Sequence, residues 1–202
     1  MNRTPHRATR ALRIRLLLWI SASLAFGAPS ASGETQDSTP APSPQAADAL
    51  RLIESDDPYQ QQLGFLRLEA LREPGTAEAI RPYLDSRDPA VRAYALRALA
   101  ALEGPAAVPR LLRALQQDPH PAVRRAALLG LEPLRPHDPD ILPAFITALR
   151  DRKPEVRMTA VDVVSRIDDP RANDAIRTRN ERERDRDVQR ALSLAMKRLG
   201  GP

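Results

Sequence analysis

Few side chains in this sequence could do chemistry. The 202 residues include no cysteine, which excludes thiol catalysis, disulfides and cysteine-ligated zinc. His137 stands close to Asp138 and Asp140, and one histidine with two acids could be imagined as a metal site. Prolines restrict that loop and no second histidine is near, so we favour a solvated turn. His120, between two prolines, is the other histidine outside the N-terminal leader, which holds His6.

The sequence contains no recognisable Ser-His-Asp set, glycine-rich phosphate loop or longer metal motif. We therefore expect no catalytic residue, no cofactor and no bound metal. On this basis the chain is predicted not to be an enzyme.

The densest group of ionisable residues runs from Arg179 to Asp187, where four arginines balance four acids. Mixed charges at helical spacing are typical of a solvated helix face with weak ion pairs. A docking site for a charged partner is the alternative.

Residues 1–33 contain no acid and are predicted to be a signal peptide. Five arginines precede the apolar run Leu16 to Phe26, and small residues follow it, which is the order of a secretory leader. We expect cleavage near residue 27 or 32 and a periplasmic or secreted protein. The alternative is an uncleaved inner-membrane anchor formed by residues 16–28, although this run is shorter than the roughly 20 residues that span a bilayer.

The net charge has to be read together with that leader. The whole chain has 31 basic and 26 acidic residues, a net charge of +5, and five of the bases are leader arginines. Without residues 1–33, 26 bases face 26 acids and the net charge is zero. The basic charge of the full chain is therefore poor evidence for a nucleic-acid partner.

Residues 34–44, rich in Pro, Ser and Thr, are predicted to be a disordered linker, and residues 45–202 a repeat domain. A Val-Arg or Val-Gln step recurs at Val91, Val123, Val156 and Val188, with intervals of 32, 33 and 32 residues. A degenerate copy begins at Gln60, 31 residues before the first of these steps. Such a period indicates stacked supersecondary units.

Counted from each Val, small and apolar residues recur at positions +3, +4, +7, +8 and +11, one stripe of a helix. In the degenerate copy, Leu63 and Gly64 take the first two of these places. We predict an all-α, right-handed α-solenoid of about five helical hairpins of 31 to 33 residues. The first helices are expected over 45–55, 77–85, 106–117, 140–150 and 171–183.

The stretch from Asp88 to Leu99 closely resembles the second helix of a HEAT repeat, and Ala106 to Leu115 looks like the first helix of the next repeat. The unit is shorter than a typical HEAT repeat, and so resembles the compact HEAT-like repeat first associated with phycobilisome lyases. The resemblance covers roughly residues 45–199 and is specific for fold rather than for activity.

The resemblance implies a structural ladder in which an acid five residues before the Val pairs with the arginine after the Val, in the same or an adjacent repeat. Counted by unit, the ladder is complete only in the third and fourth. Gln61 and Gln189 replace the arginine in the end units, which fits ends that face solvent. We expect the arginines to be structural, with ligand contact as the alternative. The ladder members are Arg92, Asp118, Arg124, Asp151 and Arg157.

The resemblance also implies that the second helices line the concave surface, so side chains off the buried stripe would face a partner. Leucines among both charges suit a polypeptide better than a polyanion. The leucines could instead pack between repeats. The candidate partner-binding residues are Arg97, Arg125, Leu129, Glu132, Met158 and Asp162.

From these patterns we expect an exported, non-enzymatic scaffold or adaptor that binds a protein or peptide partner as a monomer. We expect no nucleic-acid partner, and membrane contact only if the leader stays uncleaved. One alternative is a membrane-anchored assembly or structural factor of the envelope.

A second alternative, implied by the resemblance, is a lyase-type enzyme, because some HEAT-like proteins attach bilins to phycobiliproteins and others excise damaged bases from DNA. Export would separate the chain from both substrates. The only tryptophan lies in the leader, which argues against base stacking.

Overall fold

The computed structural model of this chain describes residues 41–200. The predicted signal peptide, the alternative anchor at residues 16–28 and all but the end of the predicted linker lie outside the described residues. No helix in the described part of the chain is long and apolar enough to cross a membrane.

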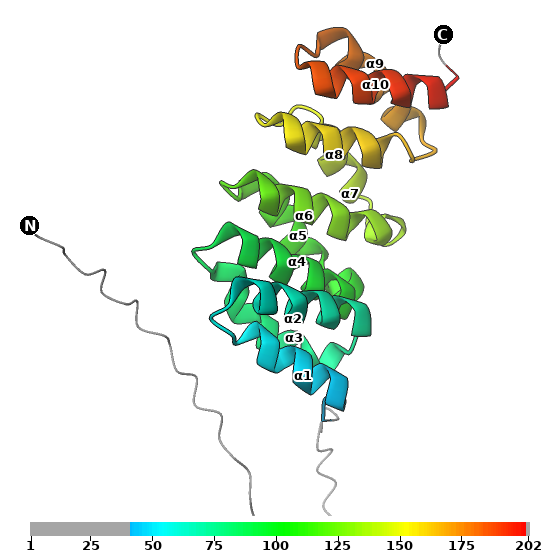
Figure 1. The fold of residues 1–202 in the computed structure, drawn as a ribbon. Coiled ribbons are helices and arrows are strands. Elements are labelled where there is room, and N and C mark those ends of the chain that lie inside the picture. The colour runs from blue at the N-terminus through cyan, green and yellow to red at the C-terminus, as the bar shows by residue number, and fades with distance from the viewer. Residues whose placement is uncertain (1–40, 201–202) are drawn as a thin grey trace, which may run out of the picture. The chain divides into compact units, whose positions relative to one another are not determined.

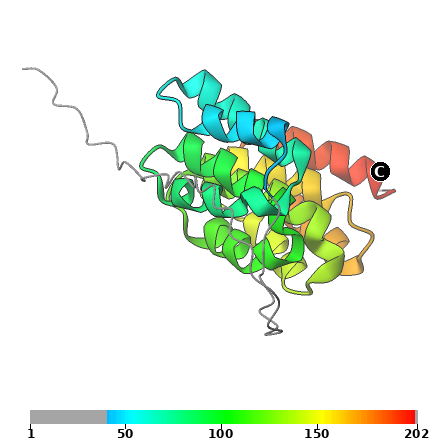
Figure 2. The same cartoon turned by 90° about the horizontal axis from the view of Figure 1, so that it is seen from below.

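The described residues form helical hairpins stacked in chain order, which confirms the predicted all-α solenoid (Figures 1 and 2). The first helices of the hairpins are α1 (Pro44–Ile53), α3 (Ala77–Ile80), α5 (Val108–Gln117), α7 (Ile141–Ala148) and α9 (Pro170–Arg182). The second helices are α2 (Pro58–Leu71), α4 (Pro89–Glu103), α6 (Pro121–Leu131), α8 (Pro154–Val164) and α10 (Arg186–Arg198). Short 3-10 helices are η1 (Pro74–Thr76), η2 (Arg81–Asp85), η3 (Gly104–Ala107) and η4 (Glu132–His137).

The second helices α2, α4 and α6 begin where the sequence places a proline after a capping residue. Asp57 accepts a hydrogen bond from the backbone N–H of Tyr59 at 2.9 Å, and Asp88 caps α4 in the same way. Before α6 the cap is His120, whose Nδ1 accepts from the N–H of Ala122 at 3.3 Å. Proline fits the first turn because its missing N–H would have no partner there.

The first helix of the second hairpin differs from the prediction of one helix over 77–85. It is split into α3 and the 3-10 helix η2, with η1 before them. Pro82 explains the break, because it has no N–H to donate and its ring clashes with the carbonyl four residues earlier. The hairpin still forms because Ile80 is fully buried against the core.

Two glycines allow neighbouring helices to approach closely. A Cβ added at Gly64 on α2 would lie 2.7 Å from the backbone N of Ile53 and 2.8 Å from the carbonyl of Ala49, both on α1. A Cβ at Gly130 on α6 would lie 3.0 Å from Leu111 Cδ2 and 3.1 Å from the Cβ of Ala100 on α4. The first glycine therefore faces backbone, and the second faces side chains.

The buried residues form two apolar clusters that meet on α4. Leu99 belongs to the N-terminal cluster with Phe65 and Ile80, whereas Leu96 belongs to the cluster that continues to α10. Phe65 also packs edge-on against Tyr83, with ring centroids 5.3 Å apart. Each hairpin thus buries its apolar side against its neighbours, as expected of a repeat array.

Candidate functional site on the second helices

A ladder of ion pairs runs along the turns that precede the second helices. Arg124 donates from Nε and Nη2 to the two carboxylate oxygens of Asp151, each at 2.7 Å. Its Nη1 donates to the carbonyls of Asp118 and Pro119, at 2.9 and 3.1 Å. Only 4% of the Arg124 side chain is exposed, so this guanidinium ties two successive units together from inside the protein.

The other rungs have the same geometry, and each arginine pairs with the acid of the following unit, not with the acid of its own. Arg92 pairs with Asp118 at 3.1 Å. Arg157 reaches Glu183 at 2.8 and 2.9 Å, so Glu183 also belongs to the ladder. Three junctions between units therefore carry an ion pair of the ladder. Arg92 forms one of them although its own unit has Ser86 in the acid position, because its partner is Asp118 of the following unit.

The end units lack the arginine. Gln61 and Gln189 each donate only to the carbonyl of their own turn, those of Ile53 and Glu183. Burial alone would raise the pKa of Asp151, but the hydrogen bonds from Arg124 and from the N–H of Lys153 lower it. The pairing and burial of these arginines assign them a role in holding units together.

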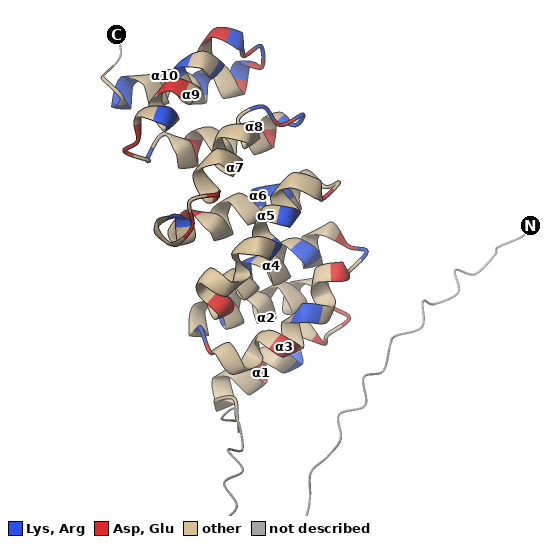
Figure 3. Ribbon diagram, turned by 180° about the vertical axis from the view of Figure 1, so that it is seen from behind, with Lys and Arg blue, Asp and Glu red and all other residues tan. Residues whose placement is uncertain are grey.

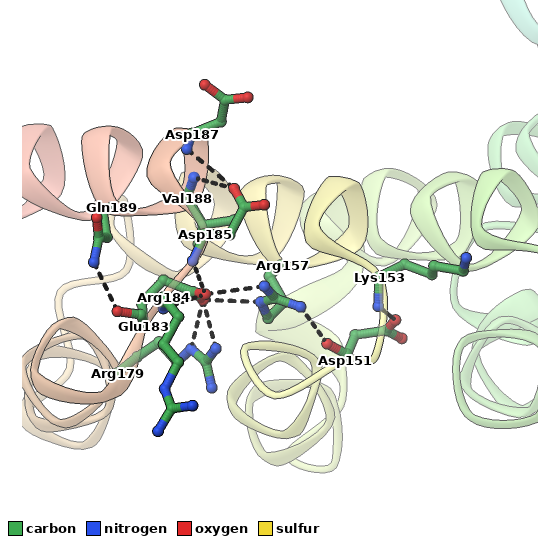
Figure 4. A network of polar contacts seen from close by, with 10 residues as sticks. All are labelled: Asp151, Lys153, Arg157, Arg179, Glu183, Arg184, Asp185, Asp187, Val188 and Gln189. Atoms are coloured by element: carbon green, nitrogen blue, oxygen red, sulfur yellow. Dashed lines mark hydrogen bonds and ion pairs between the residues drawn. The ribbon is translucent and has the colours of Figure 1, made fainter.

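Glu183 is the most heavily bonded carboxylate of the ladder (Figure 4). It accepts from Arg157, from Arg179, and from the backbone N–H groups of Arg184 and Asp185. Burial alone would raise the pKa of Glu183, but these hydrogen bonds lower it to about 2. The charged segment from Arg179 to Asp187 is therefore not one solvated helix face: at its centre is the turn between α9 and α10, where Glu183 is buried and its neighbours in sequence are exposed.

This site predicts a specific pH dependence of stability. The folded pKa of Glu183 lies below its ordinary value of 4.5, so its contribution is complete above that value and is lost as the pH falls towards 2. Between about pH 6 and pH 2 the wild type should lose about 2–3 kcal/mol more unfolding free energy than the Glu183→Gln variant. Urea unfolding followed by circular dichroism across this range measures the difference.

Glu181→Gln is the matched control, because Glu181 is exposed and lies two residues away. Its pH profile should follow the wild type. Equal slopes for wild type and Glu183→Gln would show that the buried network does not stabilise the charged form.

Most of the polar candidates for partner binding already bind neighbouring repeats. Arg97 pairs with Glu69 of the preceding hairpin at 2.7 Å. Arg125 donates to the hydroxyl of Thr159 on the following hairpin at 3.1 Å. The carboxylate of Glu132 accepts from Arg166 at 2.9 Å.

Asp162 on α8 also pairs with Arg166, which lies just after the end of that helix. Arg166 was not among the candidates predicted from the sequence. The repeat spacing could have revealed it. Arg166 donates to Glu132, which lies 34 residues earlier, about one repeat, and Arg198 donates to Ser165 at a similar separation. The contacts of Arg97, Arg125, Arg166 and Arg198 form a second set of links between units.

The apolar candidates, in contrast, face solvent. Leu129 is 39% exposed and Met158 is 36% exposed, on the adjacent helices α6 and α8. Every large hydrophobic side chain that is exposed in the described part of the chain lies on a second helix. The full set is Tyr59, Leu63, Leu66, Leu129, Met158 and Leu194, and we call it the exposed apolar set. This face can bury apolar surface against another polypeptide.

The remaining polar features are less organised. His137 ends η4 and is exposed, and within residues 41–200 no group of three or more His, Cys, Asp or Glu could hold a metal ion. Basic and acidic residues are interspersed along the helices (Figure 3).

Two open grooves, of about 860 and 590 Å³, lie between successive first helices on either side of α5. In the larger groove, Arg81 already pairs with Glu78 and Glu103. Its guanidinium is therefore not free to bind an anion there.

Comparisons with known proteins agree with this architecture. A family model described as HEAT repeats matches residues 46–132 and 108–197. A phycobilisome maturation protein of Synechococcus elongatus is 49% identical over 59 residues, which is 29% of this chain and 28% of the relative. The chain thus matches less than a third of that relative's length.

Among solved structures, the complex of CpcE and CpcF of phycocyanin lyase from Nostoc sp. PCC7120 is similar, with a TM-score of 0.63 and 21% identity. The match covers 75% of this chain and 97% of that one, and at this identity it establishes the fold. An engineered protein matches at a TM-score of 0.45 and 20% identity, covering 77% and 80% of the two chains, and is too distant to bear on function.

These findings correct the predicted function. The sequence favoured a non-enzymatic scaffold and predicted that the chain is not an enzyme. That ranking is wrong: the relative that matches over 59 residues is a phycobilisome maturation protein, which favours the lyase-type alternative. A protein partner, predicted from the exposed leucines, agrees with a similar fold that was solved as a complex of two proteins.

Proposed function

This chain belongs to the HEAT-repeat family, and we propose that it is a lyase-type protein that acts in the maturation of a chromophore-bearing protein. In this proposal the exposed side chains of Leu129 and Met158, on the adjacent second helices α6 and α8, hold the acceptor polypeptide while the chromophore is joined to it or released. The observation that carries the proposal is the match at 49% identity to a phycobilisome maturation protein. The solenoid that the chain shares with a phycocyanin lyase supports the same class.

The chemistry of the chain favours catalysis by positioning. With no cysteine anywhere in the sequence, the chain cannot carry a chromophore on a thiol of its own. Any thiol that takes part in the reaction therefore belongs to the acceptor or to a second protein. Holding two reactants in the productive orientation can by itself supply about 7–11 kcal/mol of a reaction barrier.

A second protein chain is part of the proposal. The phycocyanin lyase of similar fold was solved as a complex of two proteins, and this supports an active assembly that contains more than one chain. The predicted leader implies where the reaction would take place: after export, the chain would meet an acceptor in the periplasm or outside the cell. The N-terminal residue of the protein recovered from cells tests this part separately.

The experiment is a chromophore-transfer assay. Purified chain, a phycocyanin apoprotein and a bilin are mixed with and without a second HEAT-repeat lyase chain, and pigment that stays on the acceptor after denaturation is measured. We expect the initial rate of covalent attachment to rise at least about tenfold when this chain is added. In the reverse direction, the chain should speed loss of pigment from a loaded acceptor.

Two variants link the activity to the proposed face. Leu129→Glu should lower the rate about tenfold, because it places a charge in apolar contact with the acceptor. Gln116→Glu adds the same side chain at an exposed position on the first helix α5 and should leave the rate unchanged. No rate increase with the wild type, or equal loss in both variants, would contradict the proposal.

A further inference from the structure

The terminal second helix, α2, carries an apolar stripe on its outer side. Tyr59, Leu63 and Leu66 are 84%, 42% and 38% exposed, and Ala70 is exposed as well. Their spacing of 4, 3 and 4 residues keeps all four on one side of the helix. The opposite side of α2 holds the buried Phe65 and Leu68. The helix therefore has two apolar sides, and its own hairpin stack covers only one.

The position of α2 in the array explains why this stripe is bare. In the hairpins that follow, the residue aligned with Leu63 faces the second helix of the preceding hairpin. Thr159 on α8 holds this position, and its hydroxyl accepts a hydrogen bond from Arg125 on α6. In the row of second helices α2 is the first, and no second helix of the described chain precedes it (Figure 1). Leu63 was predicted to lie in the buried stripe, and it is exposed because no unit precedes its own within residues 41–200.

We propose that this stripe binds the same stripe of a second copy of the chain, in an antiparallel pair of α2 helices. The stripe is palindromic. If two copies cross with the point between Leu63 and Leu66 as the centre, Leu63 of each copy meets Leu66 of the other. Tyr59, the largest side chain of the stripe, then meets Ala70, the smallest, so the sizes complement each other. A two-fold interface requires such self-complementarity.

The residues that flank the stripe also suit this pairing. In an antiparallel helix pair, Gln60 lies next to Arg67 of the other copy, and Gln62 lies next to Glu69. Each of these pairs can form a hydrogen bond and none opposes like charges. At the helix ends, Asp57 of one copy lies near Arg72 of the other, with opposite charges. The antiparallel helix dipoles add a further attraction.

The surface area that this contact buries predicts the affinity of the dimer. One pair of helices of this length buries less than the about 1,200 Å² that stable complexes bury. The dimer should therefore dissociate at roughly micromolar concentration. Neither terminal unit offers a stronger route to stacking, because Gln189 stands where the last unit would need the ladder's arginine and Ser55 where the first unit would need its acid. This proposal does not depend on the proposed lyase function.

Sedimentation velocity tests the proposal on the chain as it is recovered from cells, from about 1 to 200 μM. We expect the measured mass to rise from one chain towards two. Leu63→Arg should shift the midpoint to at least about tenfold higher concentration, because it puts two unpaired cations in the seam. Leu194→Arg, the same change at a side chain 60% exposed on α10, should leave the midpoint unchanged.

Cysteine cross-linking tests the register without relying on a destabilised variant. The chain has no cysteine, so Leu63→Cys and Leu66→Cys each introduce one thiol. A mixture of these two variants should form disulfide-linked dimers faster than either alone, and faster than a mixture with Leu194→Cys. A monomer at every concentration, an equal effect of Leu63→Arg and Leu194→Arg, or equal cross-linking in all mixtures would overturn the proposal.

Discussion

Replacing Arg124 by methionine is expected to lower the free energy of unfolding by about 3–5 kcal/mol. The change leaves the carboxylate of Asp151 without its bidentate partner. It also leaves the carbonyls of Asp118 and Pro119 without the donor that they share. Methionine replaces most of the buried aliphatic stem, so the loss reports mainly on unpaired polar groups. Chemical unfolding followed by far-ultraviolet circular dichroism measures it.

Arg125→Met is the matched control, one residue along the same helix. Arg125 is exposed and makes a single hydrogen bond to Thr159, so the expected cost is below about 1 kcal/mol. If the two variants lose the same free energy, the buried ladder is not what couples the repeats.

Replacing Gly64 by alanine is expected to cost about 3 kcal/mol, although alanine is the better helix former by about 1 kcal/mol. The new Cβ would lie 2.7 Å from the backbone N of Ile53 and 2.8 Å from the carbonyl of Ala49. Backbone atoms cannot rotate away as a side chain can, so α1 and α2 must move apart. Thermal and chemical unfolding of the variant measure the loss.

Gly130→Ala is the informative comparison. Its Cβ would meet Leu111 Cδ2 at 3.0 Å, which a change of rotamer relieves, and the Cβ of Ala100 at 3.1 Å, where a small shift of α4 is enough. The strain and the gain in helix propensity should nearly cancel, leaving a change within about 1 kcal/mol. A larger loss at Gly130 than at Gly64 would contradict this reading of the helix packing.

The fold was predictable because repetition averages out local irregularities. The Val steps at Val91, Val123, Val156 and Val188 fixed the period, and the hairpin boundaries followed from the prolines and caps. The split of α3 from η2 was missed because the apolar pattern continues through Pro82, while its missing N–H interrupts the backbone hydrogen bonds.

Less of the candidate site could be predicted, because it depends on contacts between units. The positions of Arg97 and Glu132 were found by alignment, but their partners Glu69 and Arg166 lie one unit away. The exposure of Leu63 was missed for a similar reason: Leu63 follows the repeat pattern, and it is exposed because no other unit of the described residues packs in front of its own.

The function could not be read from motifs because the proposed catalysis is by positioning and needs no recognisable nucleophile in this chain. The absence of cysteine and the predicted export both argued against an enzyme. The relatives favour the lyase-type alternative, and a cysteine-free chain is compatible with it when the acceptor supplies the reacting group.

The central claim, that this solenoid promotes chromophore transfer, is tested most directly by the rate at which pigment becomes covalently bound to an acceptor. With acceptor, bilin and a second lyase chain held constant, we predict a rate proportional to the concentration of this chain and reduced about tenfold by Leu129→Glu. A rate that is the same with and without this chain would contradict the account.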